Sequence, residues 1–187
     1  MTESMPRPLV ILDVQDAIDQ PVWAAKNNPD YLENIVRLLS HWRQMDWPVL
    51  HVKHDEANPA STYAASGPWN GIKAEVAPIG GETIIVKTQN CAFIGTELDR
   101  ELKALGVNRF ILTGVVIHNS IDATVRAGRA LGYTIDLPLD ATTAVPVTGL
   151  NGQVWEAQTV FDVTAAILAS EYVLPCTVDE LLADRTD

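Results

Sequence analysis

The sequence has few of the residues that would mark a disulfide-rich or nucleic-acid-binding protein. Only two cysteines, Cys91 and Cys176, occur in 187 residues, and no Cys-x-x-Cys spacing links them. We therefore expect two structural thiols rather than a disulfide framework or a thiolate metal centre. Thirteen basic residues stand against 24 acidic ones, a formal net charge of −11. Because no basic cluster offsets this charge, nucleic acid and anionic membrane surfaces are not expected partners.

Long hydrophobic runs are also missing. No stretch approaches the roughly 20 apolar residues that a membrane-spanning helix needs, and residues 1–8 lack the apolar segment of an export signal. These absences predict a cytoplasmic protein. The chain shows no Gly/Ser-rich linker and no change in composition along its length, and 47% of its residues are apolar. We therefore expect residues 1–187 to form a single domain that acts on a small molecule.

The sequence does contain a regular alternation of short apolar runs with helical patterns. The runs are continuous rather than alternating, as expected of strands covered on both faces, and they occupy residues 8–13, 49–54, 83–87, 110–116, 134–139 and 172–174. The main helical patterns lie at residues 28–46, 96–105, 120–131 and 154–168. This order predicts the α/β class: a doubly wound, Rossmann-like domain with a mostly parallel sheet of about six strands and helices on both faces.

Capping residues predict several of these boundaries. Asn28 before Pro29 is typical of a helix N-cap followed by proline at the first helical position. Thr96 is a predicted cap of the next helix, and Gly106 suits the left-handed residue that ends it. Pro138 predicts an early end or an irregularity in the fifth strand.

Three polar positions follow predicted strands. Asp13 ends the first strand, Lys87 ends the third, and the turn from Val116 to Ser120 follows the fourth. Ligands in open α/β sheets bind beyond the carboxyl ends of the strands. Each of these residues also has an ordinary structural explanation. Asp13 is typical of an acid that caps a turn, Lys87 of a solvated strand end, and Ser120 of a helix N-cap. Taken together, they predict a polar site in which Ser120, at the start of a helix, stands where a nucleophile would be held.

These positions lie in segments that resemble the motifs of the isochorismatase-like, or cysteine hydrolase, superfamily. The resemblance extends from residue 8 to residue 182, and the segments are Ile11–Gln15, Lys87–Thr96, and Gly114–Arg126 together with Asp140–Thr142. The resemblance implies a catalytic triad of Asp, Lys and Cys. The matching residues here are Asp13, Lys87 and Ser120, so the sequence departs from the family at the nucleophile.

The resemblance implies further features of the site. A non-proline cis peptide is expected at Val115–Val116, with the Val116 amide as an oxyanion donor. No cofactor is implied, and a homo-oligomer, either a dimer or a tetramer, is expected. The nicotinamidase branch holds a metal through an Asp-x-His pattern, whereas this chain has the sequence Lys53-His54-Asp55-Glu56, so no metal is expected. The candidate substrate-binding residues are Gln15, Trp23, Trp69, Phe93 and His118.

Several reactions stay open for a serine in this position. A hydroxyl is far less acidic than a thiol, so amide hydrolysis through Ser120 is harder than through cysteine, although His118 is a candidate base. Alternatively, Asp13 could protonate a vinyl ether that water then attacks, but the acidic chain is a poor match for a dianionic substrate. The sequence therefore predicts a hydrolase of a C–N amide-type or vinyl-ether bond. The alternative is a naturally disabled or engineered Cys-to-Ser member that only binds its ligand.

Two other α/β families lack their signatures here. A dinucleotide-binding domain needs G-x-G-x-x-G after the first strand, where this chain has the sequence Asp13-Val14-Gln15-Asp16-Ala17. An aspartyl-phosphate phosphatase needs a second acid at the position of Gln15. Both are disfavoured.

Overall fold

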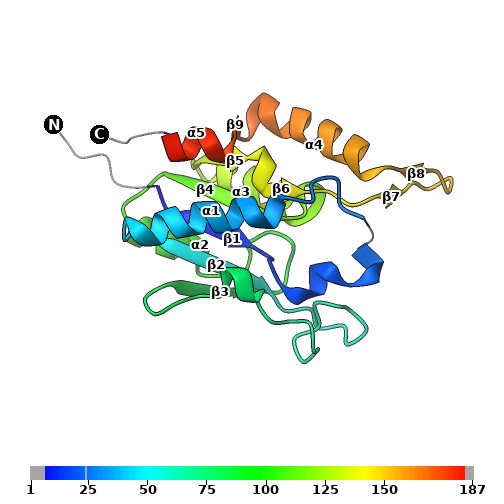
Figure 1. Cartoon of the computed structure of the whole chain (residues 1–187), viewed down its shortest axis with the longest axis horizontal. Helices are drawn as coiled ribbons and strands as arrows, with labels where there is room; N and C mark the ends of the chain where they lie inside the picture. Colours follow the sequence, from blue (N-terminus) through cyan, green and yellow to red (C-terminus); the bar gives the residue numbers. More distant parts are fainter. Residues whose placement is uncertain (1–6, 24, 184–187) are drawn as a thin grey trace.

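A parallel β-sheet forms the centre of the computed structural model, which describes residues 7–23 and 25–183 (Figure 1). Its strands lie in the order β3, β2, β1, β4, β5, β9, and these neighbours all run parallel. A short strand, β6, also pairs with β4. The predicted α/β class with a mostly parallel sheet is confirmed. The strands are β1 (Leu9–Leu12), β2 (Val49–His54), β3 (Thr83–Lys87), β4 (Arg109–Val115), β5 (Thr134–Pro138), β6 (Thr142–Thr143) and β9 (Leu174–Cys176).

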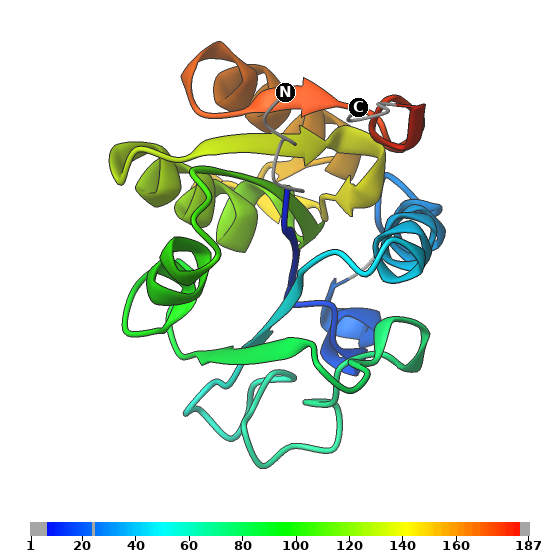
Figure 2. The same ribbon diagram turned by 90° about the vertical axis from the view of Figure 1, so that its left-hand side faces the viewer.

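Helices cover both faces of the sheet, as Figure 2 shows. One face packs against α1 (Tyr31–Gln44) and α5 (Val178–Ala183), and the other against α2 (Leu98–Ala104), α3 (Asp122–Ala130) and α4 (Ala157–Glu171). Successive strand residues point to opposite faces. Accordingly, Leu9 and Ile11 belong to one apolar core, and Val10 and Leu12 to the other. This explains why β1 is a continuous apolar run.

Shorter helices connect these elements. In the described part of the chain, four of them are 3-10 helices, and one is a π-helical turn. They are η1 (Asp16–Asp19), η2 (Pro21–Trp23), η3 (Ala74–Val76), the π turn η4 (Ile117–Ile121) and η5 (Leu139–Ala141). None of the helices in the described residues is both long enough and apolar enough to span a bilayer.

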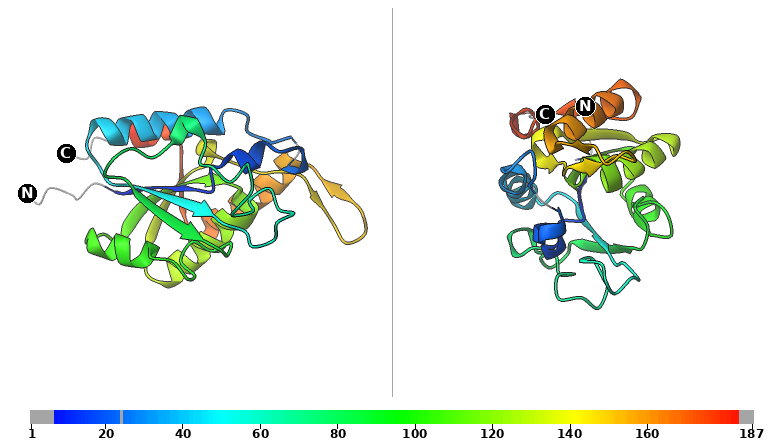
Figure 3. Two further views of the ribbon diagram at one scale, coloured as in Figure 1. Left: turned by 90° about the horizontal axis from the view of Figure 1, so that it is seen from below. Right: turned by 90° about the vertical axis from the view of Figure 1, so that its right-hand side faces the viewer.

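The first and the last of the long helices begin later than predicted. The first helix begins at Tyr31 with Asp30 at its N-cap, because the Asn28 side chain instead donates hydrogen bonds to the carbonyls of Asp140 and Thr142. The last long helix begins at Ala157 rather than at residue 154. Residues 154–155 instead form β8 (Val154–Trp155), which pairs with β7 (Val147–Thr148) in a hairpin that projects from one end of the molecule (Figure 3).

Other predicted boundaries hold or shift slightly. Gly106 follows α2 with a φ of 70°, and Pro138 is the last residue of β5, both as predicted. The Thr96 hydroxyl accepts a hydrogen bond from the Leu98 amide, while Glu97 holds the N-cap position of α2. The final strand starts two residues later than predicted, because Tyr172 still caps α4.

Gly114 allows β4 to approach β1 closely at the carboxyl edge of the sheet. Its φ is 130°, and a Cβ atom placed on it would lie 2.0 Å from the carbonyl oxygen of Leu12. Only glycine fits this position without moving one of the two strands. The contact fixes where the chain leaves β4, which is the start of the turn that carries Ser120.

Candidate active site

Asp13, Lys87 and Ser120 meet at the carboxyl edge of the sheet. Asp13 directly follows β1 with a φ of 58°, a left-handed conformation that aspartate tolerates better than most residues. Lys87 is the last residue of β3. The Lys87 Nζ atom lies 2.9 Å from Asp13 Oδ2 and 3.3 Å from Ser120 Oγ. The structure therefore brings Asp13 and Ser120 within hydrogen-bonding distance of the Lys87 ammonium group.

Ser120 lies inside a π-helical turn rather than at the first residue of a helix. The turn η4 runs from Ile117 to Ile121, and α3 continues from Asp122. The expectation that the helical segment starts at Ser120 is wrong, since it begins three residues earlier. Single π turns are rare and are frequent at functional sites. The turn places the Ser120 hydroxyl at the topological switch point between β1 and β4, where open α/β sheets bind ligands.

A cavity of about 180 Å³ opens above this group. Asp13 and Ser120 line it, whereas the Lys87 side chain is fully buried beneath them. Asp13 Oδ1 is buried and has no hydrogen-bond partner among the residues that the structure describes. The carboxylate thus keeps one unpaired acceptor atom. The full lining is Asp13, Ile18, Trp23, His54, Glu56, Ser61, Tyr63, Asn90, Val115, Val116, Asn119 and Ser120.

The electrostatics of Asp13 are set by its burial. Loss of water raises the pKa of this carboxyl above its usual 3.8, while the Lys87 ammonium, the Ser120 hydroxyl and His54 act in the opposite direction. Desolvation disfavours the charged form of an acid, and a nearby cation favours it. A raised pKa makes a carboxylate a better proton acceptor and donor near neutral pH. Asp13 is therefore suited to move protons.

Two more predicted site residues lie at this cavity. Val116 lines it, and the Val115–Val116 peptide is cis, as the family resemblance implies. Trp23 also lines it. The Trp23 indole donates a hydrogen bond to the Thr62 hydroxyl and meets the edge of Tyr63 at a centroid distance of 5.6 Å.

The other predicted substrate-binding residues are not in the cavity lining. Gln15 is completely buried and binds the backbone of His54. Phe93 stacks on Tyr133 in the core, with ring centroids 5.6 Å apart. Trp69 is 45% exposed, and His118 is half-buried, but neither side chain is among the described residues that line the cavity. Burial lowers the pKa of His118.

Several lining residues escaped the sequence reasoning. His54 ends β2 and pairs in register with Lys87, so the rule that selects polar residues at strand ends also applies to it. Tyr63 and Asn90 come from irregular segments with no periodic signal. The Tyr63 hydroxyl donates a hydrogen bond to the Asp13 carbonyl. Within the described residues, no three His, Cys, Asp or Glu side chains gather into a metal-binding group.

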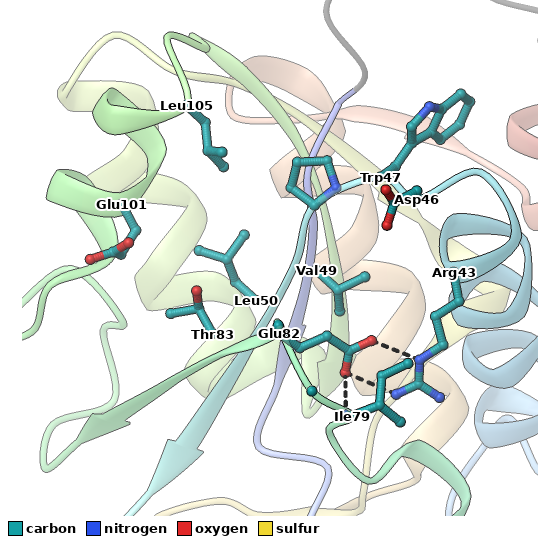
Figure 4. A pocket seen from close by; sticks show the side chains of 13 residues that line it. Arg43, Asp46, Trp47, Val49, Leu50, Ile79, Glu82, Thr83, Glu101 and Leu105 are labelled. Carbon is teal, nitrogen blue, oxygen red and sulfur yellow. Dashed lines mark hydrogen bonds and ion pairs between the residues drawn. The ribbon is translucent and has the colours of Figure 1, made fainter.

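A second cavity, of about 340 Å³, lies at the opposite edge of the sheet, near the starts of β2 and β3 (Figure 4). Its main feature is an ion pair from Arg43 Nε to Glu82 Oε1 at 2.7 Å. Glu82 also accepts hydrogen bonds from the Ile79 amide and contacts His51 Nε2 at 2.8 Å. These partners lower the pKa of Glu82 to about 2 despite the opposing effect of burial. The carboxylate thus holds a loop, a helix and a strand together.

Comparison with known proteins identifies the family of this chain. The isochorismatase domain model matches residues 8–169. The chain belongs to the isochorismatase family. It is 34% identical over 176 residues to the uncharacterized isochorismatase family protein YrdC of Bacillus subtilis, covering 94% of each chain. It is also 36% identical to the crystal structure of a Chromobacterium violaceum protein described as a hydrolase of this family, with a TM-score of 0.92 and coverage of 96% of this chain and 93% of that one.

A protein named as a hydrolase is also among the relatives. Streptothricin hydrolase of Streptomyces noursei is 30% identical over 133 residues, which cover 71% of this chain and 48% of that protein. Members of the isochorismatase family are hydrolases, and this chain is an isochorismatase-family hydrolase.

Proposed function

We propose that this hydrolase cleaves an amide-type C–N bond in a small, uncharged or cationic molecule, with Asp13, Lys87 and Ser120 as its catalytic group. The observation that carries the proposal is the charge of the cavity. Among the residues that the structure describes, its lining contains the carboxylates of Asp13 and Glu56 and no lysine or arginine. A dianionic substrate would be repelled there, since the nearest ammonium, that of Lys87, is fully buried.

The proposed reaction begins with proton transfer from Ser120 to Asp13. The Ser120 oxygen attacks the carbonyl carbon, and the Val116 amide stabilises the resulting oxyanion. Asp13 then returns the proton to the leaving nitrogen as the C–N bond breaks. In the second half, Asp13 takes a proton from water, which attacks the serine ester. As the ester C–O bond breaks and the acid is released, Asp13 returns this proton to Ser120 Oγ, which restores the starting state. Lys87 stabilises the developing negative charge on Ser120 Oγ, 3.3 Å away.

The size of the cavity supports a small substrate. At about 180 Å³ it is smaller than the roughly 300–1,000 Å³ typical of pockets for drug-sized ligands. The aromatic rings of Trp23 and Tyr63 line it beside Glu56. Aromatic faces next to a carboxylate suit an uncharged or cationic group.

Hydrolysis of a vinyl ether is the second candidate reaction. The raised pKa of Asp13 favours it, because a carboxyl group with a raised pKa keeps its proton to a higher pH and can donate it to an enol-ether carbon. In that reaction Ser120 would only orient substrate or water. The third possibility is a protein disabled by serine in the cysteine position, which binds the same ligands without converting them.

Variants of the two lining residues distinguish these reactions. Wild type, Asp13→Asn, Ser120→Ala and Ser120→Cys are assayed for ammonia release from a panel of small primary amides and for loss of isochorismate. The proposal predicts amide turnover that falls at least about 100-fold in both Asp13→Asn and Ser120→Ala. Turnover of isochorismate that survives in Ser120→Ala supports the vinyl-ether reaction. An inert wild type with an active Ser120→Cys variant identifies a disabled cysteine hydrolase.

We also propose that the protein is cytoplasmic and forms a homo-oligomer, either a dimer or a tetramer. Exposed apolar side chains support self-association: Val163 is 56% and Ile167 46% exposed on α4, and Trp155 is 46% exposed on the β7–β8 hairpin. Contiguous exposed apolar surface is typical of protein interfaces. Light scattering coupled to size-exclusion chromatography tests this, and a monomer at micromolar concentration contradicts it.

A further inference from the structure

His54 lies directly beside the catalytic group without belonging to it. It is the last residue of β2 and pairs in register with Lys87, the last residue of β3. Its ring lines the cavity, and its side chain is 12% exposed. The ring Nδ1 atom lies 3.1 Å from Lys87 Nζ. The imidazole and the ammonium therefore form a hydrogen bond at the edge of the cavity.

The Lys87 ammonium has more neighbours than protons. It carries three N–H donors, and four nitrogen or oxygen atoms of the described residues lie within hydrogen-bonding distance of it. Asp13 Oδ2 at 2.9 Å and the Gln89 carbonyl at 3.0 Å can only accept hydrogen bonds. The third proton is left for His54 Nδ1 at 3.1 Å or for Ser120 Oγ at 3.3 Å. Since two donors cannot face each other at this distance, Nδ1 must be unprotonated, and the neutral ring carries its proton on Nε2.

The other side of the ring agrees with this tautomer. His54 Nε2 lies 3.7 Å from the Glu56 carboxylate, which favours a proton on that nitrogen. Tyr63 meets the ring edge-on, with centroids 5.9 Å apart. Neither ring nitrogen is then available to take a proton from Ser120. This argues against a role for His54 as the general base.

The backbone of His54 is fixed by two buried amide side chains. Gln15 accepts a hydrogen bond from the His54 amide at 2.7 Å and donates one to its carbonyl at 3.0 Å. Asn70 donates a second hydrogen bond to the same carbonyl, also at 3.0 Å. Gln15 is completely buried, and Asn70 is 5% exposed. Such a rigid backbone attachment is what a ring needs to hold another side chain in place.

We infer that His54 is a positioning residue, whose unprotonated Nδ1 accepts the third proton of Lys87 and holds the ammonium between Asp13 and Ser120. In the resting enzyme this leaves the Ser120 hydroxyl to donate toward Asp13. When negative charge develops on Ser120 Oγ, the same ammonium proton can turn toward it. The catalytic consequence rests on the function proposed above, whereas the tautomer can be measured without any substrate.

Nitrogen NMR tests the tautomer directly. The protein is labelled with ¹⁵N-histidine, and the His54 signals are assigned as those missing from His54→Asn. At pH 8, Nδ1 of His54 is expected at the shift of an unprotonated, hydrogen-bonded ring nitrogen and Nε2 at that of a protonated one. In Lys87→Met the Nδ1 signal is expected to move toward the shift of a nitrogen without a donor. A protonated Nδ1 in the wild type, or an Nδ1 signal unchanged by Lys87→Met, overturns the inference.

Two substitutions of His54 test the catalytic consequence. Asparagine places Oδ1 where histidine places Nδ1, so His54→Asn keeps a hydrogen-bond acceptor for Lys87. Leucine has the same branching at Cγ but no acceptor atom, so His54→Leu removes this hydrogen bond. His54→Leu is expected to lower kcat about 10- to 100-fold with little change in KM, the size of effect that outer-shell partners usually have. His54→Asn is expected to restore kcat to within about 5-fold of the wild type. Equal losses in both variants, or none in either, overturn the positioning role.

Controls separate this inference from its alternatives. His41→Asn removes an imidazole from α1, outside the site, and is expected to leave kcat unchanged. Urea unfolding of each variant shows whether a loss of kcat reflects an unfolded fraction. If the wild type hydrolyses no amide, the proposed function fails, but the NMR result still decides whether His54 holds Lys87. If amide hydrolysis is present and the tautomer is reversed, the proposed function stands and this inference fails.

Discussion

The buried ion pair between Lys87 and Asp13 makes the stability of this protein predictable as a function of pH. Lys87→Met keeps the length and much of the packing of the side chain but removes its charge. The substitution leaves Asp13, which is 4% exposed, without its cation. Lys87 is the main influence that lowers the pKa of Asp13 against the effect of burial. In the variant, that pKa should therefore rise further above its usual value.

The magnitude follows from the contact distance and the burial of both groups. Opposite unit charges about 3 Å apart attract by about 5–6 kcal/mol at an effective dielectric of about 20. Part of this attraction offsets the cost of removing both groups from water, so loss of one partner of a buried pair typically costs about 3–5 kcal/mol. Folded proteins are stable by about 5–15 kcal/mol. The variant should therefore fold, with a free energy of unfolding that is measurably reduced at pH 8.

The loss should shrink in acid. In the unfolded chain Asp13 ionises near pH 3.9, whereas in the folded variant it keeps its proton to a higher pH. A group whose pKa is raised by folding favours the folded state below its unfolded pKa, and this benefit is lost as pH rises to the folded pKa. The pKa of Asp13 is also raised in the folded wild type, but less than in the variant. The stability difference between the two proteins should therefore fall, by up to about 1.4 kcal/mol for each pH unit, as pH decreases from the folded pKa of the variant to that of the wild type.

Urea unfolding of wild type, Lys87→Met and the double variant Asp13→Asn/Lys87→Met at pH 5, 6, 7 and 8 measures this difference. Removing both charges should recover most of the loss at pH 8 and remove its pH dependence. A Lys87→Met loss that is the same at pH 5 and pH 8 would refute the reasoning. So would a double variant as unstable as the single one, because the uncompensated charge would then not be the cause.

Three other outcomes can be measured on the same protein. Because burial raises the pKa of Asp13, kcat/KM measured against pH should fall in acid with a midpoint above pH 3.8. A midpoint at or below pH 3.8 would contradict the role of buried Asp13 as the base. Gly114→Ala, whose Cβ would lie 2.0 Å from a carbonyl oxygen, should lower the free energy of unfolding by more than about 3 kcal/mol. Gly106 also has a positive φ, of 70°, but a Cβ atom there would meet open space, so Gly106→Ala should lower the free energy of unfolding by only about 1–2 kcal/mol. If urea unfolding gives equal losses for the two variants, the close contact between Gly114 and Leu12 is disproved. Burial raises the pKa of Cys176 to about 12, so iodoacetamide at pH 8 should label it far more slowly in the folded protein than in urea, as peptide mass spectrometry would show.

The framework of the fold was largely predictable because its strands are short and apolar throughout. A run such as Leu9–Leu12 must be covered on both faces, and only a sheet with helices on either side covers it. The ends of such runs also locate polar residues at the carboxyl edge of the sheet. That reasoning selected Asp13 and Lys87, which the structure places 2.9 Å apart. It applies equally to His54, at the end of the strand between theirs.

Segments without a repeating pattern were not predictable in this way. The start of α1 moved to Tyr31 because Asn28 bonds to carbonyls more than a hundred residues away, a contact that no local motif reveals. Tyr63 and Asn70 come from a long irregular segment, and they bond to Asp13 and Gln15, which lie 50 and 55 residues away in the sequence. Helix and strand periodicity reports only which face of an element is buried.

The sequence by itself determined which strands end in a reactive side chain. An acid follows the first strand, an amine ends the third, and a hydroxyl follows the fourth. Only the tertiary structure decided which side chains complete the site. In the folded protein, the Phe93 side chain packs in the core and Trp69 lies outside the cavity lining. His54 contacts Lys87. The physical reason is that an apolar pattern predicts which residues are buried, and each residue contributes to that burial separately. The direction of a buried polar group depends on donors and acceptors that meet only when the chain is folded.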